Sequence, residues 1–182
     1  ANGIDIEQQE DYIKDEEEKG QTVVLVGSQD SVKGIISIAD VVREDAKKLV
    51  SKLKSQGIKK VVMLTGDNKR AARAISDQIG LDAYFAELLP EEKVKVLDKL
   101  QKEYGRTAMV GDGINDAPAL ASADLGIAIG GAGTDVAMET ADVVLMSAEI
   151  KKLSYAVGLS RATVRNMKQN IYFALFVAAL LL

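Results

Sequence analysis

Short apolar runs alternate with amphipathic segments along most of this chain, and the alternation limits the folds open to it. Apolar runs lie at 61–64, 107–110, 125–129 and 143–146, with a shorter one at 84–85. Segments with a helical period lie between them, at 44–56, at 69–79 and from 90 to about 104. This order predicts βαβ units, and hence a doubly wound α/β fold with a parallel sheet covered on both faces.

The two ends of the chain differ from this pattern. Residues 5–19 are acidic and lack a regular period, so we expect a solvated segment there, followed by strands at 21–26 and 34–39.

Residues 171–182 are uninterrupted apolar sequence, too short for the roughly 20 residues that a membrane span requires. A buried C-terminal helix is one explanation. Basic residues precede this run, namely Lys151, Lys152, Arg161, Arg165 and Lys168, and they favour the start of a truncated transmembrane helix.

Composition excludes several kinds of chemistry. The chain contains no cysteine and no histidine, which excludes disulfides, thiolate or imidazole metal sites and histidine acid–base catalysis. A bound metal would therefore be a hard cation held by oxygen, such as Mg²⁺ or Ca²⁺. The net charge of −4 gives no general basic surface, so we expect no nucleic-acid partner.

Residues 109–120, Met-Val-Gly-Asp-Gly-Ile-Asn-Asp-Ala-Pro-Ala-Leu, contain the most specific motif. A predicted strand leads into Asp112, which lies between glycines, and Asp116 follows four residues later. These carboxylates could hold Mg²⁺ directly or through water, and Asn115 could donate to a phosphoryl oxygen. A plain turn with a capped helix is the alternative. The loop lacks the third glycine of a dinucleotide fingerprint, and the chain contains no P-loop.

Two further features favour a phosphate ligand. Thr65, Gly66 and Asp67 follow a predicted strand and open a helix, where free N–H groups bind anions, although Thr65 or Asp67 could simply cap that helix. Lys93 lies in the first turn of the helix that begins at Pro90, against the helix dipole. A nearby phosphate would explain Lys93, and pairing with a neighbouring glutamate would explain it equally well. Parallel strands bring such loops to one sheet edge.

Together these motifs resemble the phosphorylation domain of the heavy-metal-transporting P-type ATPases, a branch of the haloacid dehalogenase-like phosphotransferases. Asp40 and Arg43 match the Asp-x-x-Arg at the point where the family's chain re-enters this domain. Residues 133–146 and 159–170 are also similar to the heavy-metal pumps, and the resemblance covers about residues 21–182.

The resemblance implies roles for the matching residues. Asp112 would bind Mg²⁺ with support from Asp116. Asp67 would arrange its loop or contact the nucleotide side. The residues that would hold the phosphoryl group are Thr65, Gly66, Lys93 and Asn115. Mg²⁺ and ATP would be the cofactors, the cargo would be Zn²⁺, Cd²⁺, Co²⁺ or Cu⁺, and the segment would lie on the cytoplasmic face of a multi-pass protein of the cell membrane.

The resemblance also implies a domain division. Residues 1–31 would be an acidic linker or the tail end of a nucleotide-binding domain. Residues 32–150 would form the phosphorylation domain, and 151–182 a basic helix with the start of the membrane helix.

The sequence departs from the family in one respect that affects catalysis. The Asp-Lys-Thr-Gly-Thr segment that carries the phosphorylated aspartate is absent. We therefore expect a sheet that is incomplete on its N-terminal side and a chain that is inactive alone. A free-standing binding or regulatory module without a nucleophile, or a soluble phosphatase of the same superfamily, are the alternatives.

Overall fold

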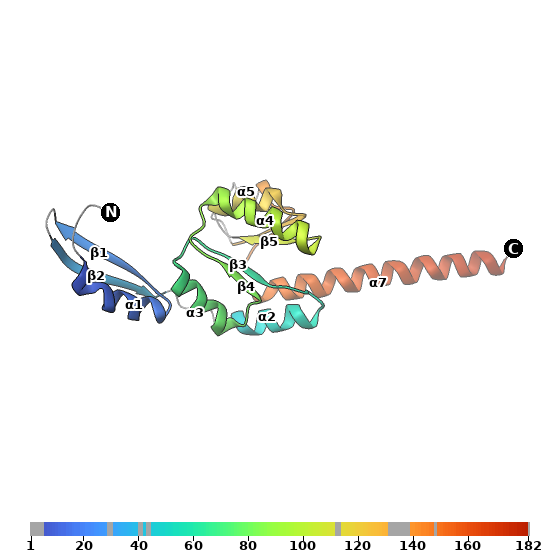
Figure 1. The fold of residues 1–182 in the computed structure, drawn as a ribbon. Helices are drawn as coiled ribbons and strands as arrows, with labels where there is room; N and C mark the ends of the chain where they lie inside the picture. Colours follow the sequence, from blue (N-terminus) through green and yellow to red (C-terminus); the bar gives the residue numbers. More distant parts are fainter. Residues whose placement is uncertain are drawn as a thin grey trace.

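The computed structural model describes residues 6–28, 31–39, 42, 45–111, 114–130, 139–147 and 149–181. An N-terminal unit, a central α/β region and a long C-terminal helix follow one another in space, as Figure 1 shows. The helices and strands predicted at 21–26, 34–39, 44–56, 69–79 and 90–104 are present, with ends shifted by a few residues at most.

The N-terminal unit contains a helix that the sequence did not predict. A 3₁₀ turn η1 (Glu7–Gln9) leads into α1 (Glu10–Glu18), which packs on an antiparallel hairpin of β1 (Gln21–Ser28) and β2 (Ser31–Ala39). The segment that was expected to lack a regular period is therefore helical over α1, although most of the side chains of α1 are exposed, as in a solvated segment. The expected domain boundary after residue 31 falls within the hairpin, and the division into domains stays a prediction.

Local charge pairs support the helix in this acidic segment. Lys14 pairs with Glu10 at 3.3 Å and Lys19 with Asp15 at 2.7 Å, both one helical turn apart. Hydrogen bonds to Asp15 first and to a neighbouring glutamate second raise the pKa of Lys19 above its ordinary value. Arg70 of the central region bonds to Glu17, which joins the two units.

All described strands of the central region pair in parallel. One sheet contains β3 (Val62–Leu64) and β4 (Ala83–Phe85), and the other contains β5 (Ala108–Gly111), β6 (Leu125–Ile129) and β7 (Val143–Leu145) in that order. The α/β class with parallel strands is thus confirmed. The described strands form two sheets, because no backbone ladder joins β3 to β5, a gap that is compatible with the incomplete sheet that we expected.

Helices cover both faces of the sheet that contains β6. On one face, Ala128 packs in a cluster with Leu97 of α4 (Pro90–Tyr104) and Leu120 of α5 (Ala117–Ser122). On the other face, Ile127 packs with residues of α2 (Asp45–Ser55) and α7 (Lys151–Leu180). Consecutive residues of a strand point to opposite faces, so β6 is buried on both, as a doubly wound fold requires.

Aspartates cap the N-terminal ends of the parallel strands. Asp82, just before β4, accepts a hydrogen bond from the Val61 N–H at 2.8 Å. Asp124, just before β6, accepts one from the Thr107 N–H at 2.9 Å, and Asp142, just before β7, accepts one from the Gly126 N–H at 2.8 Å. Each carboxylate therefore satisfies a backbone donor near the start of the adjacent strand.

The C-terminal helix α7 extends well beyond the rest of the chain (Figure 1). Its first turns are buried at Leu153 and Ser154. Its later apolar side chains are exposed, including Ile171, Phe173 and Phe176. Among the helices that the structure describes, none combines the length and the apolar character needed to cross a membrane.

We predict that Asp124 stabilises the fold in a pH-dependent manner. The Thr107 N–H, and secondly Gln101, lower the pKa of Asp124 from its ordinary value of 3.8. The folded chain then binds fewer protons than the unfolded chain, so the stabilisation is present above pH 3.8 and is lost as the pH falls through the lowered pKa.

Asp124→Asn should accordingly flatten the acid side of the stability–pH profile, measured by urea unfolding between about pH 2 and 6. Asp98→Asn provides the control, because Asp98 is exposed on α4 and makes no hydrogen bond or ion pair with the described residues. Identical profiles for the two variants would contradict the prediction.

Candidate functional site

The loop after β3 is organised by its own side chains. The Thr65 hydroxyl donates to Asp67 Oδ2 at 2.6 Å, and the Asp67 N–H donates to Thr65 Oγ1 at 3.1 Å. Asn68 caps the following helix, α3 (Lys69–Ile79), because its Oδ1 accepts from the Ala71 N–H at 2.9 Å. Neither Thr65 nor Asp67 is therefore the cap, and the capping alternative from the sequence does not account for them.

Backbone hydrogen bonds join this loop to the segment that leads into α4. The Glu87 N–H donates to the Asp67 carbonyl at 2.8 Å, and the Leu88 N–H donates to the Thr65 carbonyl at 3.0 Å. Glu87 adopts a positive φ of 59°, an uncommon conformation for a residue other than glycine. These contacts hold the first turn of α4, which carries Lys93, near the carboxyl end of β3.

Lys93 forms an ion pair with Asp116 across the site. Lys93 Nζ lies 2.7 Å from Asp116 Oδ1, and the two side chains are only 13% and 17% exposed. The partner comes from the loop after β5 rather than from the helix of Lys93. The alternative in which Lys93 pairs with a neighbouring glutamate is therefore not what the structure shows, and Glu92 instead accepts the Leu89 N–H at 2.9 Å.

Gly111, the last residue of β5, creates the space that Asp116 occupies. A Cβ at Gly111 would lie 2.7 Å from Asp116 Cβ and 2.8 Å from Asp116 Oδ2, much closer than real Cβ atoms approach. The Asp116 carboxylate therefore lies against the backbone at the end of β5. The sequence analysis had not assigned this role to Gly111, although a glycine directly before the first aspartate was the available signal.

The other predicted site residues are placed less fully. Asp112 lies outside the described residues, as do Asp40 and Arg43 and the region 131–138. Asn115 is exposed in the 3₁₀ turn η2 (Ile114–Asp116), and Gly66 lies in the loop after β3. The structure thus brings Thr65 together with Asp67 and Lys93 together with Asp116, and the roles of all these residues remain predictions.

The donor set is compatible with Mg²⁺. Asp116 offers a second carboxylate oxygen, Oδ2, that receives no hydrogen bond from the part of the chain that is described. No group of three acidic side chains that could hold a metal occurs within that part. A Mg²⁺ ion here would thus require ligands beyond Asp116, of which Asp112 is the candidate from the sequence.

Sequence reasoning missed the aspartates at the strand starts. Asp82, Asp124 and Asp142 each stand directly before an apolar run, at the edge opposite to the predicted site. This position was a usable signal, because an acceptor at a strand start can satisfy a free N–H.

Comparison with known proteins agrees with the sequence motifs. The family description "haloacid dehalogenase-like hydrolase" matches residues 3–124. A probable cadmium-transporting ATPase of Alkalihalophilus pseudofirmus is 50% identical over 166 residues, which cover 90% of this chain and 23% of that protein. A copper-exporting P-type ATPase of Bacillus subtilis is 48% identical over 159 residues, covering 87% and 20%.

Solved structures give the same result. Two crystal structures of a zinc-transporting PIB-type ATPase are 48% identical to this chain, with TM-scores of 0.73 and 0.75. The match covers 94% of this chain and 28% of each of those chains.

The chain therefore belongs to the haloacid dehalogenase-like hydrolases. Within that class it corresponds to the phosphorylation-domain region of the heavy-metal-transporting PIB-type ATPases. It spans about a fifth to a quarter of the length of the curated relatives described above.

We predict that Gly111→Ala disrupts the site. The added Cβ forces Asp116 away from β5 and lengthens its ion pair with Lys93, a loss that should lower the unfolding free energy by about 1–3 kcal/mol. Gly34→Ala provides the control, because no atom lies within 4 Å of a Cβ at Gly34. Urea unfolding compares the two variants, and equal stabilities would show that the close approach is not needed.

Proposed function

We propose that this chain supplies the Mg²⁺- and phosphate-binding part of the phosphorylation site in an ATP-driven heavy-metal cation pump. The observation that carries the proposal is the Lys93–Asp116 ion pair, 2.7 Å long and largely buried at the carboxyl edge of β5. A lysine in the first turn of a helix opposes the helix dipole, so a specific anionic partner must hold it there. A phosphoryl group, like the Asp116 carboxylate, has negatively charged oxygens that a lysine can bind.

The separation between the two parallel sheets supports a position for the strand that this chain lacks. In the described residues, β3 pairs only with β4, and β5 pairs only with β6. The inner edges of β3 and β5 therefore have backbone groups available for another strand. We propose that in the pump the strand leading to the Asp-Lys-Thr-Gly-Thr segment lies between them, which would place the phosphorylated aspartate between Thr65 and Asp116.

The chain's own residues would then hold and neutralise the transferred group. Lys93 would move from Asp116 to a phosphoryl oxygen, and Thr65 and the N–H of Gly66 would donate to the others, with Asn115 at the rim. Asp67 orients Thr65 through the 2.6 Å hydrogen bond. Asp112 and Asp116 would hold Mg²⁺, which, when bound, neutralises charge on the phosphoryl oxygens.

The membrane location and the cargo rest on two further observations. The exposed apolar residues of α7 follow the basic residues Arg161, Arg165 and Lys168, as at the cytoplasmic flank of a membrane helix. Relatives are described as transporting cadmium, copper or zinc. We propose that α7 leads into the membrane of the pump and that the cargo is Zn²⁺, Cd²⁺, Co²⁺ or Cu⁺.

The printed chain alone should form no aspartyl phosphate, because it contains no Asp-Lys-Thr-Gly-Thr segment. Incubation with γ-labelled ATP and Mg²⁺, followed by acid precipitation, measures this directly. The full pump, labelled under the same conditions, provides the positive control. Acid-stable label on the printed chain would contradict the proposal and favour an independent enzyme.

Substitution of Lys93 should have opposite effects on the two ligands. Mg²⁺ must compete with the Lys93 ammonium for the Asp116 carboxylate, so Lys93→Gln should strengthen Mg²⁺ binding. The same substitution removes a cation from the phosphate site, so it should weaken inorganic phosphate binding by about tenfold.

Asp116→Asn should instead weaken Mg²⁺ binding by about tenfold, since it removes a ligand charge. Isothermal titration with each ligand separates these effects, and Lys99→Gln, on the same helix but exposed, provides the matched control. Parallel changes in both affinities for Lys93→Gln would show that Lys93 acts only through stability.

A further inference from the structure

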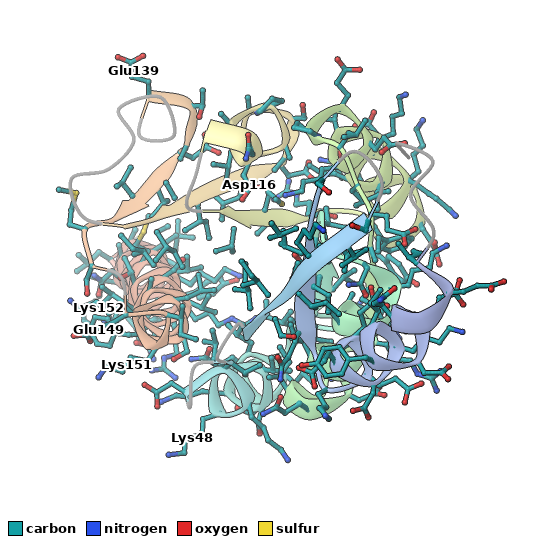
Figure 2. The ribbon with its side chains drawn as sticks, turned by 90° about the vertical axis from the view of Figure 1, so that its left-hand side faces the viewer. Lys48, Asp116, Glu139, Glu149, Lys151 and Lys152 are labelled. Atoms are coloured by element: carbon teal, nitrogen blue, oxygen red, sulfur yellow. The ribbon has the colours of Figure 1, made fainter. Side chains whose placement is uncertain are left out.

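A groove between α2 and α7 lies apart from the site described above. The groove is open to solvent and has a volume of about 610 Å³, comparable in size to small-molecule sites. Its walls carry lysines from both helices, Lys48 and Lys52 from α2 and Lys151 from α7. Figure 2 shows Lys48 and Lys151 on the same side of the molecule, away from Asp116.

Among the described residues, the lysines of the groove outnumber the carboxylates beside them. Lys48 and Lys52 are exposed, lie one helical turn apart and form no ion pair with the described residues. Like charges at this spacing repel each other, so the sequence places them together at a cost. Asp45 is the one carboxylate among the lining residues. Lys151 pairs with Glu149 at 3.3 Å, an exposed contact that a bound anion can replace easily.

The groove also has an apolar wall and a fixed geometry. Leu49, Leu159 and the largely exposed ring of Tyr155 line it. Gln56 Nε2 donates to the Ser154 carbonyl at 2.9 Å, which fixes α2 against α7. A Cβ at Gly158 would lie 3.1 Å from the same Gln56 nitrogen, so a glycine at this position allows the close approach of the helices.

We propose that this groove binds a soluble phosphorylated ligand of nucleotide size. The lysines would neutralise the phosphate groups, and Tyr155 would stack on the base. A phospholipid headgroup has the same charge but fits the geometry less well. Tyr155 lies sixteen residues before Ile171, where the apolar part of α7 begins, or about 24 Å at 1.5 Å per residue. A bilayer around the apolar part would leave its headgroups short of the groove.

The inference is independent of the proposed function, because the groove contains none of the sheet-edge residues. A ligand bound there would contact α2 and α7 together.

The test measures binding of ATP to the 182-residue chain in EDTA by isothermal titration. The double variant Lys48→Gln/Lys52→Gln should weaken ATP binding at least tenfold, whereas Lys47→Gln, exposed on the same helix, should leave it unchanged. Tyr155→Leu should weaken ATP binding several-fold without changing the affinity for tripolyphosphate. Melting temperatures of the variants should match that of the parent chain, since all these side chains are exposed.

Three results would overturn the proposal. Unchanged ATP affinity in the double lysine variant would show that the groove does not bind it. If Lys93→Gln weakened ATP binding tenfold, as much as the double variant does, the nucleotide would bind at the carboxyl edge of the sheet instead. Vesicles of phosphatidylglycerol and phosphatidylcholine could also displace ATP from the chain. If that displacement required Lys48 and Lys52, the groove would bind a membrane headgroup. The labelling experiment tests only the proposed function, so its outcome does not alter how these three results are interpreted.

Discussion

The central region depends on one strand, β6, that is buried on both faces. Ile127 and Ala128 are neighbours in sequence, yet they belong to different hydrophobic clusters, one under α2 and α7 and the other under α4 and α5. Their strand also pairs with β5 on one side and β7 on the other. A change that moves β6 would therefore disturb both clusters and both ladders. Leu97 and Leu120, the largest fully buried side chains, each contribute about 1.5–3 kcal/mol to the same packing.

The two ends of these parallel strands are chemically different. At the N-terminal ends, aspartates satisfy backbone N–H groups, and in Asp82 and Asp124 these hydrogen bonds lower the pKa. At the carboxyl ends, Asp116 is paired with a lysine across the site instead. The carboxylates at the N-terminal ends stabilise the fold. At the carboxyl ends, by contrast, a cation can replace Lys93 at the Asp116 carboxylate, or Lys93 can leave Asp116 and bind a phosphate. Only the second end is suited to bind a ligand.

The sequence predicted the regular elements because their signals are local. Gly80 ends α3 in a left-handed conformation, and Pro90 begins α4, so the bounds of both helices were predictable. The bounds of α1 were not predictable, since the segment carries few apolar residues; the structure shows ion pairs along it and contacts with β1. The local patterns did not show which strands pair, because sheet pairing depends on which strands are present and not on the pattern of any one.

The candidate site was predictable as a set of residues but not as a set of contacts. Motif spacing suggested that Lys93 and Asp116 share an edge, yet only the fold shows that they bond, and that Gly111 makes the space. The Asn68 cap, by contrast, is a local contact with the Ala71 N–H, and an asparagine directly before the helix was the available signal. The contacts of Asp116 with Lys93 and Gly111 follow from tertiary packing, which no local pattern encodes.

The ion pair has a consequence for how such a site works. A lysine that already bonds to a carboxylate is held in position before a phosphate arrives, so little conformational entropy remains to be lost on binding. The same bond must be broken for Lys93 to reach a phosphoryl oxygen, and a cation that binds Asp116 offsets that loss. Binding of the cation and binding of the phosphate are thus coupled through one lysine, and each should strengthen the other. A site built in this manner favours phosphate together with its metal ion over either alone.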